Sequence, residues 1–218
     1  YGRVTKPDAH AEVFKQLTDS LKTSQVTEVD FSSCGIGAVA LGHLSDWVRD
    51  ATAGVTRLTL DSNSIFGELV EADKFVADCD AFLAALKDSN ILTLSLQKTG
   101  IGPLTLRKLA TSLPAAVARL SLGSNPQIGD EAMVQLLDAL KDVSLTSLDI
   151  SKTGCGISTA SKLAELLSGA TKFGAALKSL TVDSTGVPKL TRGSKQDKDA
   201  SGPRTYTLTT SEDKIELS

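Results

Sequence analysis

Six segments of this chain repeat one spacing of apolar residues, so the chain is expected to fold as an array of like units. In each segment apolar residues stand at positions 1, 4 and 6, a small polar residue at position 9, and an apolar residue at position 11. Five segments keep this register, and the sixth fits after one inserted residue. Position 4 is occupied by Val29, Leu58, Leu94, Leu120, Leu148 and Leu180. Units of this length cannot bury their apolar faces alone, so neighbours must share one core.

A second pattern lies between these segments, with apolar residues at i, i+3, i+4 and i+7, which is typical of an amphipathic helix. Leu106, Leu109, Ala110 and Leu113 are one example. The offset from segment to helix is 12 residues in three units (29 to 41, 94 to 106, 148 to 160) and 13 in the unit with the insertion (120 to 133). The sequence therefore predicts short strands that alternate with helices.

The strand pattern resembles the leucine-rich repeat of the ribonuclease-inhibitor type, L-x-x-L-x-L-x-x-N-x-(I/L), over residues 10 to about 190. The resemblance implies an α/β solenoid, or horseshoe, with a parallel β-sheet on the concave face and α-helices on the convex face. Only Asn63 and Asn125 keep the Asn of the motif. Thr or Cys stands there in the other units, where we expect looser contacts, at Cys34, Thr99, Thr153 and Thr185.

The chain divides into three parts on this interpretation. Residues 1–25 hold an N-terminal helix of a partial or capping repeat, with Phe14, Leu17 and Leu21 as its apolar stripe. Residues 26–190 hold about six repeats, the second of which carries nine extra residues around positions 66–74. Residues 191–218 form a polar loop and C-terminal strands. They either cap the array, as a hairpin of residues 205–210 and 214–217, or start another repeat of a longer array.

Composition excludes some classes of function. The 218 residues are 41% hydrophobic and 22% charged, with a net charge of −3, which disfavours nucleic acid as a partner. No run of 18 apolar residues is present, so we expect no membrane span, and residues 1–10 are too polar for a secretion signal. Three scattered Cys without a C-x-x-C motif favour reduced thiols and an intracellular, cytoplasmic protein.

One motif suggests a nucleotide site. Gly35, Gly37 and Ala40 form a G-x-G-x-x-A between a strand and a helix, and Asp61 ends the next strand, as in dinucleotide-binding folds. Glycine recurs in the same loop of other repeats, however, which favours a requirement of the turn and no cofactor. These glycines are Gly100, Gly102, Gly129, Gly154 and Gly156.

Other side chains give no catalytic pattern. His10 and His43 have no Cys or His four residues on, so they are interpreted as surface residues rather than metal ligands. The acidic residues near position 70 lack the alternating ligands of a calcium loop. Trp47 flanks a helical stripe and is expected at the edge of the core. We therefore expect no enzyme activity and no metal.

The candidate site follows from strand alternation, because every second side chain of a strand faces the same side. Arg57 and Arg119 are the only residues on the expected concave face of a type enriched in binding hot spots. The candidate concave-face residues are Glu28, Asp30, Arg57, Asp61, Gln97, Arg119, Asp149 and Asp183. The inserted loop adds candidate rim residues at Glu68, Glu71 and Asp73.

The sequence favours a non-catalytic protein–protein interaction scaffold of the leucine-rich repeat type. Its expected partner is another protein, rather than nucleic acid, a membrane or a small-molecule substrate. Two alternatives remain open, because other proteins share this repeat type. The first is a cytoskeletal capping or axonemal component, since the tropomodulin C-terminal domain resembles these repeats. The second is a GTPase-activating accessory that resembles the Ran GTPase-activating protein, although no residue here maps to that role.

Overall fold

Helices and short strands alternate along the chain in the computed structural model, which describes residues 6–182, 189–192, 206–209 and 214–217. The helices are α1 (Ala11–Leu21), α2 (Ala38–Asp50), α3 (Asp80–Lys87), α4 (Pro103–Ala110), α5 (Gly129–Leu140), α6 (Ile157–Ser168) and α7 (Lys172–Ala176). The strands of the main sheet are β1 (Glu28–Asp30), β2 (Arg57–Thr59), β3 (Thr93–Ser95), β4 (Arg119–Ser121), β5 (Ser147–Asp149) and β6 (Ser179–Thr181). We number the repeats by these strands, so that repeat 1 contains β1.

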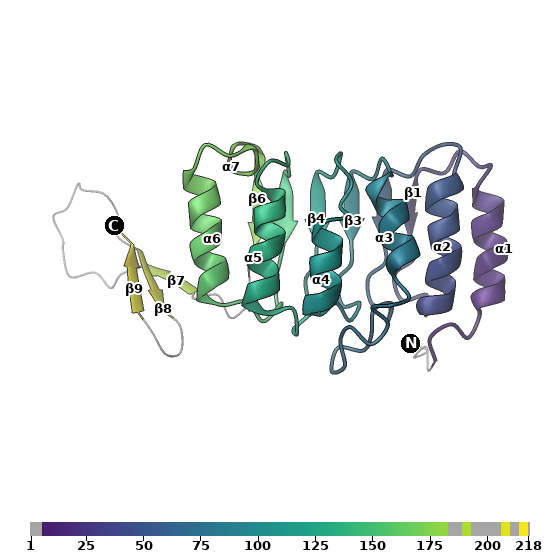
Figure 1. Cartoon of the computed structure of the whole chain (residues 1–218), viewed down its shortest axis with the longest axis horizontal. Helices are drawn as coiled ribbons and strands as arrows, with labels where there is room; N and C mark the ends of the chain where they lie inside the picture. The colour runs from purple at the N-terminus through teal and green to yellow at the C-terminus, as the bar shows by residue number, and fades with distance from the viewer. Residues whose placement is uncertain (1–5, 183–188, 193–205, 210–213, 218) are drawn as a thin grey trace.

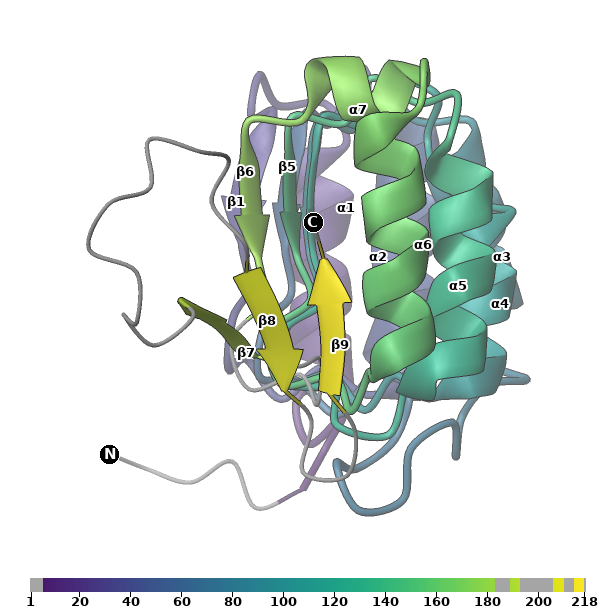
Figure 2. The same cartoon turned by 90° about the vertical axis from the view of Figure 1, so that its left-hand side faces the viewer.

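The six strands form one all-parallel sheet in the order β1-β2-β3-β4-β5-β6. Equivalent residues of successive repeats lie side by side: Val29 is in register with Leu58, and Leu58 with Leu94. The helices cover one face of this sheet and leave the other uncovered, so the molecule has two layers (Figures 1 and 2). The predicted mixed α/β architecture with a parallel sheet is confirmed. We call the uncovered side the open face.

The core lies between the two layers and runs through all inner repeats. The central leucines of β2 to β5 are at most 2% exposed, whereas Val29 and Leu180 in the outer strands are only partly buried. Leu136 and Leu137 of α5 are fully buried beneath the helix layer. Each such side chain contributes about 1.5–3 kcal/mol through burial, so repetition of the spacing builds one continuous core.

The first helix departs from its predicted stripe. Phe14 packs edge-to-face on Phe31 at a centroid separation of 5.1 Å, as the stripe requires. Leu17, however, is 45% exposed, and the buried position one residue later belongs to Thr18. The reason is that α1 packs on α2 alone among the helices, whereas α2 and α5 each have a helix on either side.

Two further side chains lie deeper than expected. Trp47 is fully buried rather than at the edge of the core, with its ring 6.3 Å from that of Phe31. His43, one turn earlier in α2, is half-buried, and its Nε2 has no hydrogen-bond partner. Both residues belong to α2, which packs against α1 as well as α3.

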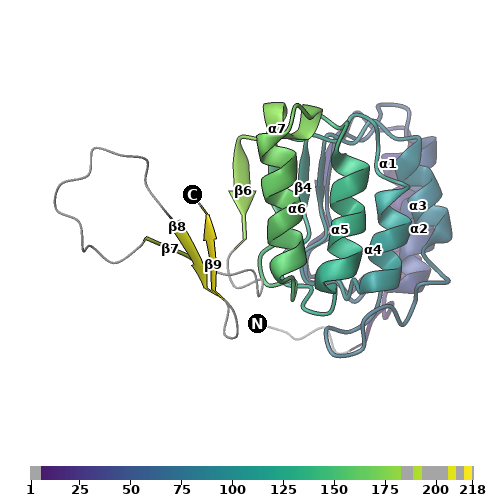
Figure 3. The ribbon, with the colours of Figure 1, turned by 60° about the vertical axis from the view of Figure 1, so that its left-hand side comes forward.

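The last strands form a separate antiparallel sheet, β7 (Lys189–Arg192), β8 (Tyr206–Thr209) and β9 (Lys214–Leu217). Leu208 pairs with Ile215, so β8 and β9 make a hairpin (Figure 3). This is the pairing of the hairpin alternative, and residues 215 and 217 do not extend the parallel sheet. Within the described residues, no helix is both long and apolar enough to cross a membrane.

Candidate functional site

The open face carries the candidate partner-binding residues in the predicted order. Glu28, Arg57, Thr93 and Arg119 lie in register on successive strands, as do Asp30 and its counterparts in the next row. Glu28, Asp30, Arg57 and Arg119 are exposed, whereas the leucines between them point into the core. Asp183 lies outside the described residues. The sheet therefore presents ordered rows of polar side chains on its open face.

The two arginines of the open face differ in their surroundings. Arg57 Nε lies 3.3 Å from Glu28 Oε2, and both side chains are half-exposed or more. Arg119 stands between Thr93 and Ser147. In the described part of the chain Arg119 joins no ion pair, in contrast to Arg57. Arg119 is thus an exposed cation of the open face without an ion pair among the described residues, a distinction that the sequence did not reveal.

Asp61 and Gln97 are tied to each other across two repeats. Asp61 Oδ1 accepts a hydrogen bond from Ser95 Oγ at 2.7 Å and another from the Gln97 backbone N–H at 2.8 Å. These bonds use one carboxylate oxygen to join the ends of β2 and β3. Asp61 therefore stabilises the sheet through Oδ1, and only its Oδ2 is available to bind a partner protein.

Asp149 and Asp30 also bond to their own sheet. Asp149 accepts from Ser121 Oγ at 3.1 Å and from the Ser151 N–H at 2.9 Å, which occupies both carboxylate oxygens. The hydroxyl and the backbone N–H of Ser32 donate to Asp30 and lower the pKa of that carboxyl. The acidic side chains of the open face are thus held in fixed orientations.

The inserted loop presents a tight turn at its apex. The Glu71 N–H donates to the Glu68 carbonyl at 3.0 Å, and Val70 between them is 83% exposed. Glu71 pairs with Lys74 at 2.8 Å. Below the apex, Phe66 is fully buried and anchors the loop in the core. The predicted rim therefore exposes Glu68, Val70 and Glu71.

Asp73, the third predicted rim residue, is turned into the fold. Its Oδ1 accepts hydrogen bonds from the N–H groups of Gly102 and Thr105, both at 3.0 Å, and its Oδ2 accepts one from Leu104 at 2.8 Å. These are free N–H groups at the amino end of α4, where a negative charge is favourable. Asp73 is therefore a helix cap supplied by the preceding repeat.

The same cap recurs at two other helices. Asp8 accepts from Gly37, Val39 and Ala40 at the start of α2, with three distances of 2.9 Å. Asp130 accepts from the main-chain N–H groups of Gly156, Ser158 and Thr159 at the start of α6. Each Asp stands 26 or 29 residues before the glycine that it caps. An Asp about one repeat before each Gly-x-Gly turn is the sequence signal that could have revealed the caps.

The caps explain the recurrent Gly-x-Gly. A Cβ atom at Gly37 or Gly102 would lie 2.5 Å from an oxygen of the capping Asp. Gly35 and Gly100, two residues earlier, have φ angles of +71° and +77°, which favour glycine. In the nucleotide-like motif, Asp8 already binds the N–H groups that a pyrophosphate would need, so the turn requirement accounts for these glycines.

Each capping Asp bonds to the repeat that follows it, whereas the two Asn of the motif bond to the repeat that precedes them. Asn125 Oδ1 accepts from the N–H groups of Thr99, Gly100 and Ile101 at 3.0–3.2 Å. Its Nδ2 donates to the Leu96 carbonyl at 2.9 Å. Asn63 likewise accepts from the Ile36 N–H and donates to the Phe31 carbonyl.

Threonine at the same place bonds only within its own repeat. The Thr99 hydroxyl donates to the Leu96 carbonyl, and that of Thr153 to the Ile150 carbonyl and the Cys155 thiol. The expectation of fewer contacts there is confirmed for both. Thr185 lies outside the described residues. Repeats 2 and 4 thus supply Asp and Asn, and repeats 1, 3 and 5 supply the Gly-x-Gly turns.

The thiols are placed unfavourably for nucleophilic chemistry. Desolvation raises the pKa of the buried Cys79 and Cys155 and also that of the exposed Cys34. A raised pKa lowers the thiolate fraction, and the thiolate is the nucleophile. Among the described residues, no three His, Cys, Asp or Glu side chains gather as a metal site would require.

The geometry defines a mixed α/β protein. Its strands alternate with helices along the chain, and six of the strands form one parallel sheet. Its open face is polar, and its repeats are joined by half-buried Asp and buried Asn side chains. No protein-family profile matches the sequence, and no curated protein is significantly similar to it.

Proposed function

We propose that the protein is a non-catalytic protein–protein interaction scaffold of the leucine-rich repeat type. In this proposal the sheet curves into a horseshoe, with the open face on its concave side and the helices on its convex side. Six in-register parallel strands and the bonds of Asn63 and Asn125 support the repeat type. Three free cysteines fit an intracellular, cytoplasmic setting.

The observation that carries the proposal is Arg119, an exposed cation without an ion-pair partner among the described residues. Arginine is enriched in binding hot spots, because its guanidinium binds carboxylates with two parallel hydrogen bonds. Around Arg119 the strands offer hydroxyl groups, such as Thr93 and Ser147, which can donate or accept. The partner is therefore a protein that brings an acidic side chain to the middle of the sheet.

Site-specific cross-linking tests the proposal. A photoreactive residue replaces Ser121 on the open face, and in a control it replaces Ala139 on the exposed side of α5. We expect one cellular protein to cross-link at position 121 and not at 139. Its purified form should bind the wild-type chain at least about tenfold more tightly than the Arg119→Glu variant. Equal affinity for both would move the binding site away from the open face.

The Arg57→Glu variant supplies a matched comparison. Because Arg57 already pairs with Glu28, we expect its reversal to weaken binding less than reversal of Arg119 does. Because both side chains are exposed, we expect both variants to keep the fold. Thermal unfolding of the two variants checks this. A larger loss from Arg57 than from Arg119 would contradict the central role of Arg119.

A further inference from the structure

The first unit of the array exposes apolar residues at positions that inner repeats bury. Leu17 in α1 is 45% exposed, and Val26 just before β1 is 39% exposed. The residues equivalent to Leu17 are at most 5% exposed, namely Leu44, Phe82, Leu109, Leu136 and Leu163. Those equivalent to Val26 are at most 2% exposed, namely Val55, Ile91, Val117 and Leu145. This end of the core therefore lacks a covering layer in the described structure.

The sheet is open at the same end. In β1 and its flanks the Thr27 carbonyl and the Phe31 N–H bond toward β2. Main-chain groups of a strand point to alternate sides, so those of Glu28 and Asp30 face the opposite edge. Since β1 is first in the sheet order, no described strand pairs with that edge. It is a template for a further strand.

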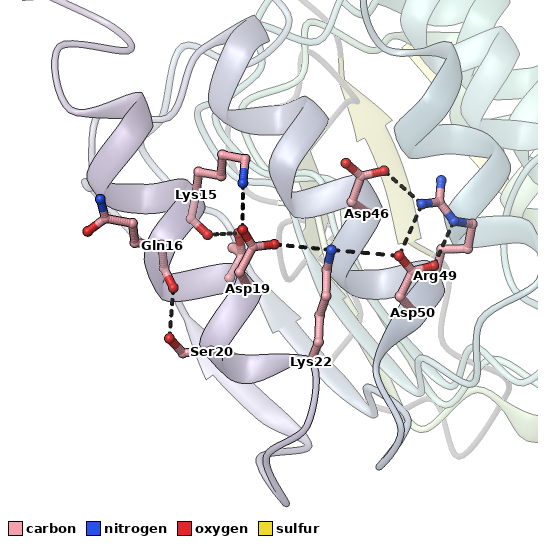
Figure 4. A network of polar contacts seen from close by, with 9 residues as sticks. Lys15, Gln16, Asp19, Ser20, Lys22, Asp46, Arg49 and Asp50 are labelled. Carbon is pink, nitrogen blue, oxygen red and sulfur yellow. Dashed lines mark hydrogen bonds and ion pairs between the residues drawn. The ribbon is translucent and has the colours of Figure 1, made fainter.

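This end is held firmly enough to serve as a binding surface. Lys22 Nζ, just after α1, lies 3.1 Å from Asp19 Oδ1 and 3.7 Å from Asp50 Oδ2 at the end of α2 (Figure 4). The Thr52 N–H also donates to the Lys22 carbonyl at 3.0 Å. Together with the Phe14–Phe31 contact described above, these bonds fix α1 against the next unit.

The charges at the edge select its occupant. Glu28 and Asp30 stand on the open face beside the unpaired backbone groups, and the strand that does pair with β1 places Arg57 opposite Glu28. A second copy of this chain, paired antiparallel along β1, would set these acids against each other, which is unfavourable. A cationic strand meets the same side chains with opposite charge.

We infer that the outer edge of β1 binds an extended, basic segment of another polypeptide by strand addition. The segment alternates cationic and apolar residues. Its cations lie beside Glu28 and Asp30 on the open face, and its apolar residues cover Leu17 and Val26 on the helix side. The site lies at the end of the sheet, and the inference does not rest on the proposed role of Arg119.

A pair of synthetic peptides tests the inference with the intact chain. One alternates lysine and valine, and the control alternates glutamate and valine. Calorimetric titration should show binding of the lysine peptide alone. Hydrogen exchange measured by NMR should show the amides of Glu28 and Asp30 becoming protected in the complex. Binding of both peptides, of neither, or without protection of these amides would overturn the inference.

Three variants separate this edge from general attraction between charges. Glu28→Lys/Asp30→Lys should lower the affinity for the lysine peptide by about tenfold or more, and Glu28→Gln/Asp30→Asn by less. The latter keeps the inference testable if the double lysine variant does not fold. Asp142→Lys changes an exposed acid elsewhere and should leave the affinity unchanged. An equal loss in the Asp142 variant refutes the inference.

The apolar part and the second-copy alternative have their own measurements. Leu17→Ser should weaken the peptide complex without loss of folded structure, because Leu17 is already half-exposed. An unchanged affinity would contradict the predicted contact on the helix side. Sedimentation velocity tests self-association. A dimer of the free chain with Glu28 and Asp30 amides protected would show that a second copy occupies the edge and would overturn the inference.

Discussion

Asp73 Oδ1 accepts a hydrogen bond from the Gly102 N–H at 3.0 Å, across the boundary between repeats 2 and 3. The Asp and the glycine are 29 residues apart in the chain. The contact caps α4 and at the same time joins two repeats. Because the carboxylate is held by three N–H groups, it contributes to stability through both its charge and its geometry.

Removal of this cap should destabilise the chain. We expect Asp73→Ala to lower the free energy of unfolding by about 1–2 kcal/mol, since three N–H groups at the start of α4 lose their acceptor. Urea denaturation followed by circular dichroism measures the change. Glu68→Ala, at the exposed apex of the same loop, is the matched control and should change the value by less than about 0.5 kcal/mol. Similar losses in both variants would contradict the capping role.

Gly102 should depend energetically on Asp73. A Cβ at position 102 would stand 2.5 Å from Asp73 Oδ2, so Gly102→Ala should be destabilising in the wild-type chain. In the Asp73→Ala background the clash with the carboxylate is absent and the contact with Ala72 Cβ at 3.1 Å remains, so the same substitution should cost at least about 0.5 kcal/mol less. A double-mutant cycle of unfolding free energies measures this coupling. Additive effects would show that the glycine is required for another reason.

Asp130 should make stability depend on pH. Burial raises the pKa of this carboxyl, but bonds from the Thr159 hydroxyl and from the Gly156, Thr159 and Ser158 N–H groups outweigh burial and lower it. A carboxyl with a lowered pKa in the folded state stabilises above its unfolded pKa of about 3.9, and this contribution is lost as the pH falls further. Asp130→Asn should therefore lower the unfolding free energy at neutral pH.

The difference between the wild-type chain and Asp130→Asn should shrink as the pH falls below about 4, because the carboxyl of the unfolded chain then takes up a proton before that of the folded chain does. Unfolding free energies measured at several pH values provide the test. Asp142→Asn, which replaces an exposed acid outside the caps, is the variant for comparison. A difference that stays constant down to acid pH would show that the Asp130 charge is unimportant.

Asn125 should be more costly to replace than the threonines at the equivalent place. Asn125→Ala leaves buried N–H and carbonyl groups of two repeats without partners, so we expect a loss of about 2 kcal/mol or more. Thr99→Ala removes a single bond within one repeat and should cost about 1 kcal/mol. Chemical denaturation of the two variants checks the order. The reverse order would contradict the link between repeats.

The elements that follow local periodicity could be predicted from the sequence. The spacing of Val29, Leu58 and Leu94 predicted the strand register, because parallel strands of equal repeats align equivalent residues. The order of the charged residues along the open face could be predicted from the same register. Leu17 was predicted wrongly, since burial in an array depends on neighbours on both sides and the pattern describes only one unit.

The caps could not be found by local rules. The residue that precedes α4, Gly102, has no side chain to cap it, and the same holds for Gly37 before α2. Search for a capping residue beside the helix therefore fails, because the acceptor comes from the previous repeat. For the same reason Asp73 was interpreted as a partner-binding residue. That Arg119 forms no ion pair with a described residue could be seen only in the structure, because it depends on the positions of its neighbours.

The alternation between units that provide Asp and Asn and units that provide Gly-x-Gly restricts how such a chain can change in length. Loss or duplication of one unit would bring two units with Asp and Asn, or two units with Gly-x-Gly turns, next to each other. Asn125 would then face a neighbour without a glycine turn to bind. Repeats should therefore be gained or lost in evolution only in pairs, and a consensus design should use a pair of repeats as its unit.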